Sequence, residues 1–275
     1  TAMNVLLPFE WASHAFMKNA FLAILMVTPL FGLLSTMVVS NRMAFFSDSL
    51  GHGAFTGIAI GVLFGSVSPL MSLLAFSVVF ALFITYIKSK STASTDTIIG
   101  VFSSTAIALG LMIMSYGGGF NKFSSFLIGD VLSITDDDLQ ALVIVFVLVI
   151  IAWALLFNRL LVLSINSSFA RSRGISTFGA EGLFAAILAV VVSISIQWVG
   201  ILIINALLVL PAAAARNVTR NVKQYHVVSV LIALFAGFTG LILAYYFNMA
   251  AGATIVVLSA AIFFFTLILK SYFIR

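Results

Sequence analysis

Residues 139–157 read LQALVIVFVLVIIAWALLF, a stretch without a single charged side chain. A transmembrane helix needs about 20 consecutive, predominantly apolar residues. The run is continuously apolar rather than alternating, so it predicts a membrane-spanning helix and not a strand of a β-barrel. Runs of the same kind recur along the chain, so this pattern determines the expected fold class.

These apolar runs are separated by short breaks that hold most of the polar residues. The runs are residues 19–40, 44–66, 70–87, 97–115, 139–157, 181–197, 199–214, 227–246 and 251–269. We therefore expect an all-α, polytopic membrane protein with about 8–9 transmembrane helices. Residues 1–275 are expected to form a single transmembrane domain.

The composition supports a lipid environment. Hydrophobic residues make up 63% of the chain and charged residues only 8%, with a mean hydropathy of +1.24, whereas soluble domains carry about 25% charged residues. The net charge of +5 does not indicate nucleic-acid binding, because the basic residues are spread thinly at the ends of apolar runs. The chain has no cysteine, which excludes disulfides, thiolate metal sites and cysteine nucleophiles.

Basic residues follow four of the runs, and with nine spans all four groups fall on one side of the membrane. The groups are Lys88 and Lys90; Arg159, Arg171 and Arg173; Arg216, Arg220 and Lys223; and Lys270 and Arg275. The positive-inside rule makes that side cytoplasmic. The acidic residues 136–138 and the N-terminus are then expected outside, and Lys18 is a mild contradiction.

Asp48 and His52 are the first residues along the chain whose side chains could bind a metal ion. Their spacing of four places a carboxylate and an imidazole on one helix face, and these groups suit zinc and manganese. Ionisable groups at membrane depth are costly and need a partner or a water-filled path. A second interpretation stays open, in which Asp48 caps the helix and His52 hydrogen-bonds to it.

Residues 166–175 form a short, basic, amphipathic segment on the predicted cytoplasmic side, where Gly174 could end a short helix as a left-handed cap. Composition alone also allows an ordinary surface loop with two anchoring arginines. Further on, Pro211 predicts a helix kink. Asn205 is either a contact between helices or, if it faces a pore, a candidate ligand.

Other polar residues are expected to be structural. Thr135 and Asp138 form a capping-box pattern, and Glu181 is expected at a helix start near the cytoplasm. The phosphate-binding motif G-x-x-x-x-G-K-[ST] does not occur in the sequence, so any ATP that drives transport is expected to bind a separate subunit. We also find no recognisable catalytic arrangement, and the chain is not expected to be an enzyme.

Residues 41–54 resemble the ABC-3 type membrane subunits of zinc and manganese ABC importers. Members of this family have a basic residue, a methionine, and an Asp followed four residues later by His, which here are Arg42, Met43, Asp48 and His52. The similarity continues in consistent order through residues 94–100, 126–132, 169–175, 210–216 and 248–252. One departure is that Ser167 and Ser168 stand where relatives often have acidic residues.

The resemblance implies a type II ABC importer-like permease in the bacterial inner membrane, with the whole chain as one permease domain. It implies a homodimer, a dimeric cytoplasmic ABC ATPase and an extracytoplasmic metal-binding protein as partners. The cargo would be zinc or manganese, bound by Asp48 and His52 with Asn205 as a possible third polar group, and no cofactor would be permanently bound. The segment 166–175 would couple the permease to the ATPase through Phe169, Ala170, Arg171 and Gly174.

Two other functions compete with this one. A secondary transporter driven by an ion gradient would be supported by several intramembrane charges and an internal repeat, but the chain has few such charges and no detectable repeat. An ABC permease for a siderophore or haem shares the architecture. It is disfavoured by Asp48 and His52, since a bulky chelate needs a wide cavity rather than metal ligands.

Overall fold

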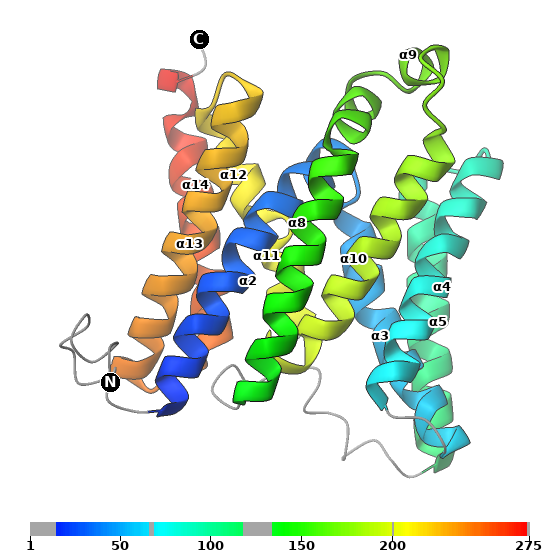
Figure 1. The fold of residues 1–275 in the computed structure, drawn as a ribbon, viewed down its shortest axis with the longest axis horizontal. Coiled ribbons are helices and arrows are strands. Elements are labelled where there is room, and N and C mark those ends of the chain that lie inside the picture. Colours follow the sequence, from blue (N-terminus) through cyan, green and yellow to red (C-terminus); the bar gives the residue numbers. More distant parts are fainter. Residues whose placement is uncertain (1–14, 66–68, 118–133, 200, 274–275) are drawn as a thin grey trace. The chain divides into compact units, whose positions relative to one another are not determined.

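The computed structural model describes residues 15–65, 69–117, 134–199 and 201–273, in which every regular element is an α-helix (Figure 1). The helices are α2 (Ala15–Ser40), α3 (Ala44–Phe64), α4 (Pro69–Lys90), α5 (Thr95–Gly117), α8 (Asp136–Ile165), α9 (Ser167–Ser172), α10 (Thr177–Val199), α11 (Ile201–Leu207), α12 (Leu210–Val218), α13 (Val222–Phe247) and α14 (Ala251–Phe273). Seven of these helices are long and apolar enough to cross a membrane. They are α2, α4, α5, α8, α10, α13 and α14. The expected all-α, polytopic membrane fold is confirmed.

Helix α3 forms where a span was predicted but is not one of these seven. It has 21 residues, which is long enough for a membrane helix. It holds Asp48, His52 and several glycines among its apolar residues. The helix that carries the candidate metal ligands is therefore a predicted span that is not among the seven.

The apolar run at residues 199–214 is divided between two helices. Helix α11 ends at Leu207, and α12 begins at Leu210 with Pro211 in its first turn. Proline at the start of a helix is favourable, because the amide hydrogen that it lacks would have no partner within the helix. Pro211 therefore lies beside the interruption, at the start of α12, and the kink predicted there stays a prediction.

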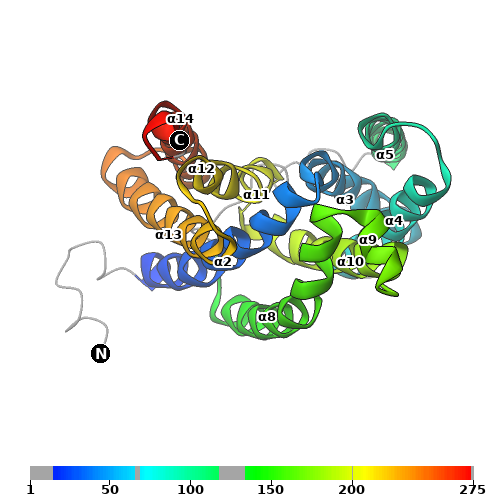
Figure 2. The same cartoon turned by 90° about the horizontal axis from the view of Figure 1, so that it is seen from above.

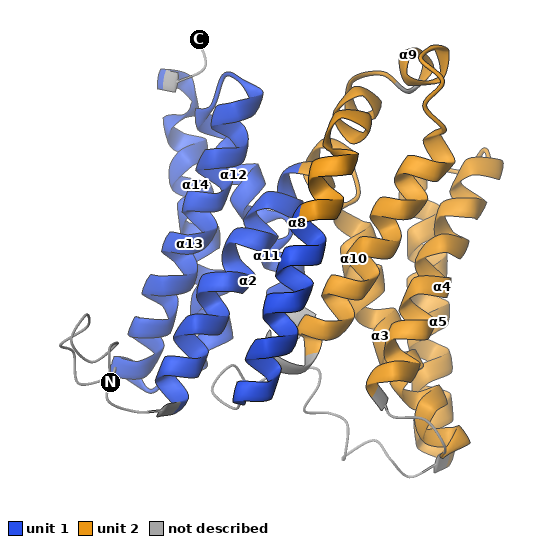
Figure 3. Ribbon diagram, viewed as in Figure 1, with its two compact units in different colours: residues 1–36, 129–150, 198–275 blue, residues 37–128, 151–197 orange. Residues whose placement is uncertain are grey.

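The chain divides into two compact units, shown in Figure 3. Unit 1 comprises residues 1–36, 129–150 and 198–275, and unit 2 comprises residues 37–128 and 151–197. The predicted motif at residues 126–132 lies outside the described residues.

In unit 2, α3 packs against both α4 and α5 through small residues. Gly53 lies against the ring of Phe80, and Gly110 lies against Thr56. The hydroxyl of Thr56 donates a hydrogen bond to the carbonyl of Ala106 on α5. Small residues and hydroxyl contacts of this kind let membrane helices approach closely.

In unit 1, α13 packs against α14 and lies beside α2 in both views (Figure 1 and Figure 2). A Cβ atom at Gly237 would collide with the Cγ2 methyl of Thr28. Nearby, the Ser229 hydroxyl donates to the carbonyl of Gly32 at 2.6 Å and lies 3.1 Å from the Ser35 hydroxyl. A glycine and a group of buried hydroxyls thus fix α2 against α13.

Charge is distributed unevenly between the two ends of unit 1. The last turns of α12 and α14 carry Arg216 and Lys270. The opposite end holds the three aspartates that begin α8, and there the Asn19 side chain donates to Asp136 at 3.0 Å. The predicted capping box is confirmed, because the Thr135 amide donates to Asp138 at 3.0 Å and the Asp138 amide donates back to the Thr135 hydroxyl at 3.3 Å.

Unit 2 also has a basic end. The last turn of α4 holds Lys88 and Lys90, and α9 contributes Arg171. The beginning of α10 lies at this same end (Figure 1). We call the end of unit 2 that carries Lys88, Lys90 and Arg171 the basic end of unit 2.

Candidate functional site

The start of α3 sets the position of the candidate metal ligands. The turn between α2 and α3 places Arg42 in the left-handed region, with φ +57°. The Met43 amide donates to the Val38 carbonyl at 2.8 Å, and the Met43 carbonyl accepts from the amide of Phe46 at 3.0 Å. Met43 is the residue that precedes the helix. Asp48 consequently lies inside α3, and the interpretation of Asp48 as the cap is wrong.

Asp48 and His52 are brought together as their spacing predicts. The Nε2 atom of His52 lies 3.6 Å from Oδ1 of Asp48, and the side chains are 36% and 49% exposed, respectively. Phe45, one turn earlier, is 62% exposed. Most other residues of α3 up to Ala59 are buried, so these three form an open stripe on a helix that is otherwise covered.

The pair offers a carboxylate oxygen and an imidazole nitrogen to one ion. Among the residues that the structure describes, no group of three or more His, Cys, Asp or Glu could hold a metal. Zinc usually takes four ligands. The described part of a single chain therefore supplies an incomplete metal site.

The third candidate ligand lies in the other unit. Asn205 is on α11 in unit 1 and is half-buried, whereas Asp48 and His52 belong to unit 2. Its role as a ligand stays a prediction.

The segment 166–175 folds into a short helix with caps at both ends. Oδ1 of Asn166 accepts hydrogen bonds from the amides of Ser168 and Phe169, at 2.9 and 3.0 Å. At the other end, the amide of Gly174 donates to Arg171 at 2.9 Å and that of Ile175 to Ala170 at 3.0 Å. This is the Schellman pattern, and Gly174 has the left-handed φ of +75°, which confirms the predicted cap.

Helix α9 has one face packed against the rest of unit 2 and another face that is exposed. Ala170 is fully buried and clusters with Leu163 and Ala180. Phe169 is 49% exposed, and the Arg173 guanidinium lies 5.2 Å from the centre of its ring. An exposed aromatic ring with cationic neighbours suits a contact with another protein.

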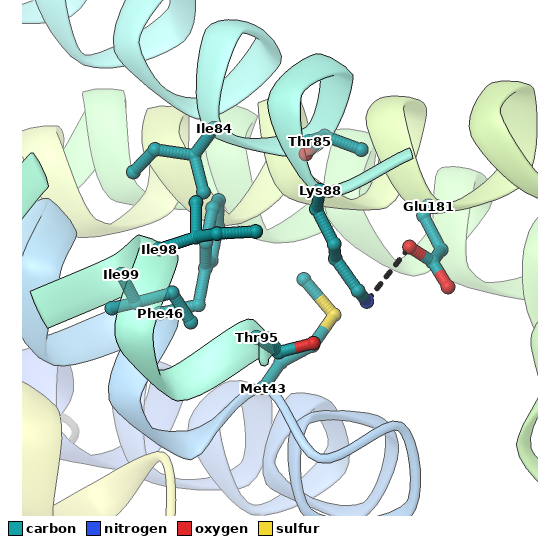
Figure 4. A pocket seen from close by; sticks show the side chains of 9 residues that line it. All are labelled: Met43, Phe46, Ile84, Thr85, Lys88, Thr95, Ile98, Ile99 and Glu181. Carbon is teal, nitrogen blue, oxygen red and sulfur yellow. Dashed lines mark hydrogen bonds and ion pairs between the residues drawn. The ribbon is translucent and has the colours of Figure 1, made fainter. Parts of the chain in front are cut away.

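The sequence did not reveal an ion pair between two distant helices. The Nζ atom of Lys88, at the end of α4, lies 2.9 Å from Oε2 of Glu181, near the beginning of α10. Both residues line a small pocket at the basic end of unit 2 (Figure 4). Each residue was expected near the cytoplasmic boundary, but no local pattern indicates that they meet.

The chain is similar over most of its length to known membrane proteins of transport systems. The model of the ABC 3 transport family matches residues 13–270. An uncharacterised membrane protein of Synechocystis sp. is 33% identical, with 92% of this chain and 90% of the relative covered. The manganese import system permease protein ScaB of Streptococcus gordonii is 29% identical, covering 94% and 91%. The high-affinity zinc uptake system membrane protein ZnuB of Buchnera aphidicola is 28% identical, covering 88% and 93%.

A solved structure has the same fold. PsaBC from Streptococcus pneumoniae, determined in complex with Fab, superposes with a TM-score of 0.80 at 27% sequence identity. The match covers 92% of this chain and 91% of that one. The helical arrangement that the apolar runs indicate is therefore shared with a known protein.

Proposed function

The chain belongs to the ABC 3 transport family, and from this we propose that it is the permease subunit of an ABC importer for a divalent transition metal, zinc or manganese. It acts in the bacterial inner membrane as one permease domain over residues 1–275. The observation that carries the cargo assignment is the Asp48–His52 pair, which is partly exposed on a helix whose other residues up to Ala59 are mostly buried.

The incomplete ligand set supports a homodimer. Two ligands from one chain are too few for a bound metal, and a two-fold axis beside the open stripe of α3 would bring two further ligands from a second copy. A carboxylate and an imidazole exposed to lipid would be costly, so a second copy or a water-filled path also accounts for their exposure. Asn205 is a further candidate polar group for the path.

The cargo ion is a substrate and not a resident cofactor. Zinc and manganese both accept carboxylate and imidazole ligands, which agrees with relatives named for either metal. A site of few ligands, completed by water and by a second chain, would bind weakly enough to release the ion.

We assign energy supply to a separate cytoplasmic ABC ATPase dimer that docks on α9. The exposed Phe169 and the cations Arg171 and Arg173 offer a contact surface, and the buried Ala170 and the Schellman turn at Gly174 hold that surface against the rest of unit 2. The basic end of unit 2, which carries α9, would then face the cytoplasm, as the positive-inside rule requires. An extracytoplasmic metal-binding protein would deliver the ion at the opposite face.

Uptake by the reconstituted complex tests this function. Liposomes that hold this chain with its ATPase and binding protein should accumulate Zn²⁺ or Mn²⁺ only when ATP is supplied. Accumulation driven by an ion gradient without ATP would identify a secondary transporter. Accumulation of a haem or siderophore complex without free metal would identify a chelate permease.

A further inference from the structure

Lys88 and Glu181 form a partly buried ion pair at the basic end of unit 2. Their side chains are only 26% and 22% exposed, and Nζ lies 2.9 Å from Oε2. Glu181 belongs to an apolar helix that is long enough to span the membrane. Charges in such a position are costly to desolvate, so removal of either charge would leave the other without compensation.

The pair lines a pocket where the ends of two other helices, α3 and α5, also meet. Met43 and Phe46 lie at the start of α3, and Ile98 lies at the start of α5. Figure 4 shows the Lys88 side chain extending past Met43 toward Glu181. The pocket measures about 10 Å³, which is room for at most one water molecule.

On the other side, Glu181 is tied to α9. Its neighbour Ala180 is 5% exposed and clusters with Ala170 of α9, which is fully buried. The backbone turn at Gly174 joins the two helices, with the amide of Ile175 donating to the Ala170 carbonyl at 3.0 Å. A displacement of α9 therefore acts directly on the first turns of α10, where Glu181 lies.

The pocket is also close in sequence to the metal pair. Phe46 lines it, and Asp48 follows two residues later on the same helix. A helix moves as a rigid element over a few turns, so a shift of the start of α3 changes the position of Asp48 and His52. The ion pair and the buried cluster thus connect α9 to Lys88 through Ala180 and Glu181, and Lys88 shares the lining of the pocket with the start of α3.

We propose that the Lys88–Glu181 ion pair is a positioning pair that links movement of α9 to the Asp48–His52 pair, and so sets how many metal ions are imported per ATP hydrolysed. The inference rests on the proposed function, because it takes α9 as the ATPase contact and Asp48 and His52 as the metal ligands. Neither Lys88 nor Glu181 contacts the metal. A series of packed contacts suggests coupling, but only a measured coupling between the two residues demonstrates it.

The test uses the complete importer in liposomes, with radioactive Zn²⁺ and Mn²⁺ as probes, and measures ions imported per ATP hydrolysed. The variants are Lys88→Gln, Glu181→Gln, Lys88→Glu, and the exchanged double variant with Lys88→Glu and Glu181→Lys. Each single variant should lower the ratio about fivefold or more, the lower end of coupling between two sites in proteins. The exchanged double variant should restore a ratio close to that of the parent. Lys88→Arg, which keeps the cation, should retain such a ratio.

Two matched variants control for general effects of charge removal. Lys90→Gln removes an exposed cation from the same end of α4, and Asp96→Asn removes an exposed carboxylate from the start of α5. Both should leave the ratio unchanged. A purely structural salt bridge would instead lower uptake and ATP hydrolysis in equal proportion, together with the amount of assembled complex.

The outcomes separate this inference from the proposed function. A parent complex that imports neither ion would overturn the proposed function, and the inference with it. Normal import by the parent, with an unchanged ratio in all single variants, would overturn the positioning role alone. The single variants could lower the number of ions imported per ATP while the exchanged double variant fails to recover it. That result would show that the two charges act separately, and it would also contradict the positioning role of the pair.

Discussion

The imidazole Nε2 of His52 lies 3.6 Å from the carboxylate Oδ1 of Asp48 on the open stripe of α3. This separation exceeds the usual length of an N–H···O hydrogen bond, and both side chains are partly exposed. The two groups are close enough to share one ion after a small adjustment. Their function can be tested without disturbing the core of unit 2.

Asp48→Ala and His52→Ala should each lower metal uptake by at least about tenfold, because even loss of an outer-shell partner of a metal ligand costs roughly 10–100-fold. Uptake in liposomes measures this, and the amount of assembled complex should match that of the parent. The matched control is Asp96→Asn, an exposed carboxylate on α5, which should transport normally. Parent rates in both alanine variants would show that the pair is not on the path.

Gly174 allows a test of α9 with a control variant at Gly65 that introduces the same backbone strain elsewhere. Gly174 and Gly65 both have left-handed φ angles, +75° and +61°, and at both positions the space that a Cβ atom would enter is open. Alanine at either position costs about 1 kcal/mol in backbone strain. Gly174→Ala should lower stimulation of the ATPase, whereas Gly65→Ala, at the end of α3, should change only the melting temperature. Equal ATPase stimulation in the two variants would argue against α9 as the contact.

Helix packing in unit 1 predicts a destabilisation that a second change relieves. Gly237→Ala should lower the free energy of unfolding by about 1–3 kcal/mol through overpacking, because the new methyl meets Cγ2 of Thr28. Thr28→Ser removes that methyl and keeps the hydroxyl, so the double variant should recover part of the loss. Melting in detergent measures both effects.

Gly100 is the control for this experiment, since nothing lies within 4 Å of a side-chain carbon placed there. Gly100→Ala should melt at or slightly above the parent temperature, because alanine favours a helix over glycine. If Gly237→Ala and Gly100→Ala melt alike, the close approach of α2 and α13 does not contribute to stability.

The proposed homodimer predicts two copies of the chain in each functional importer. The mass of the purified complex measures this directly. Because the chain has no cysteine, a single cysteine at Phe45, on the open stripe, should cross-link two copies with a short bismaleimide. A cysteine at Tyr116, which is 90% exposed at the end of α5, is the comparison. A transporting complex with one copy would refute the dimer.

Much of the fold could be predicted because each span is encoded locally. Continuous apolar runs indicated the long helices, and Thr135 with Asp138 indicated the start of α8. The division between α11 and α12 was indicated only by Pro211, because Leu208 and Val209 are as apolar as the flanking residues.

The candidate site was predictable only in part, for the same reason. Asp48 and His52 are one helical turn apart, so their proximity follows from spacing alone. Lys88 and Glu181 are 93 residues apart, and their contact depends on how α4 and α10 pack. Local sequence patterns carry no information about such a pair.

Unit 1 combines segments that are far apart in the chain, and this has a consequence for biogenesis. Helix α2 is synthesised near the beginning of the chain, but α13, which covers Ser35 through Ser229, is 194 residues further on. During synthesis α2 must remain in the bilayer or at the insertion machinery with the hydroxyl of Ser35 uncovered. Ribosomes that stop before α13 would release chains in which this face of α2 is open to proteolysis. We expect the cell's quality control to recognise α2 in such incomplete chains.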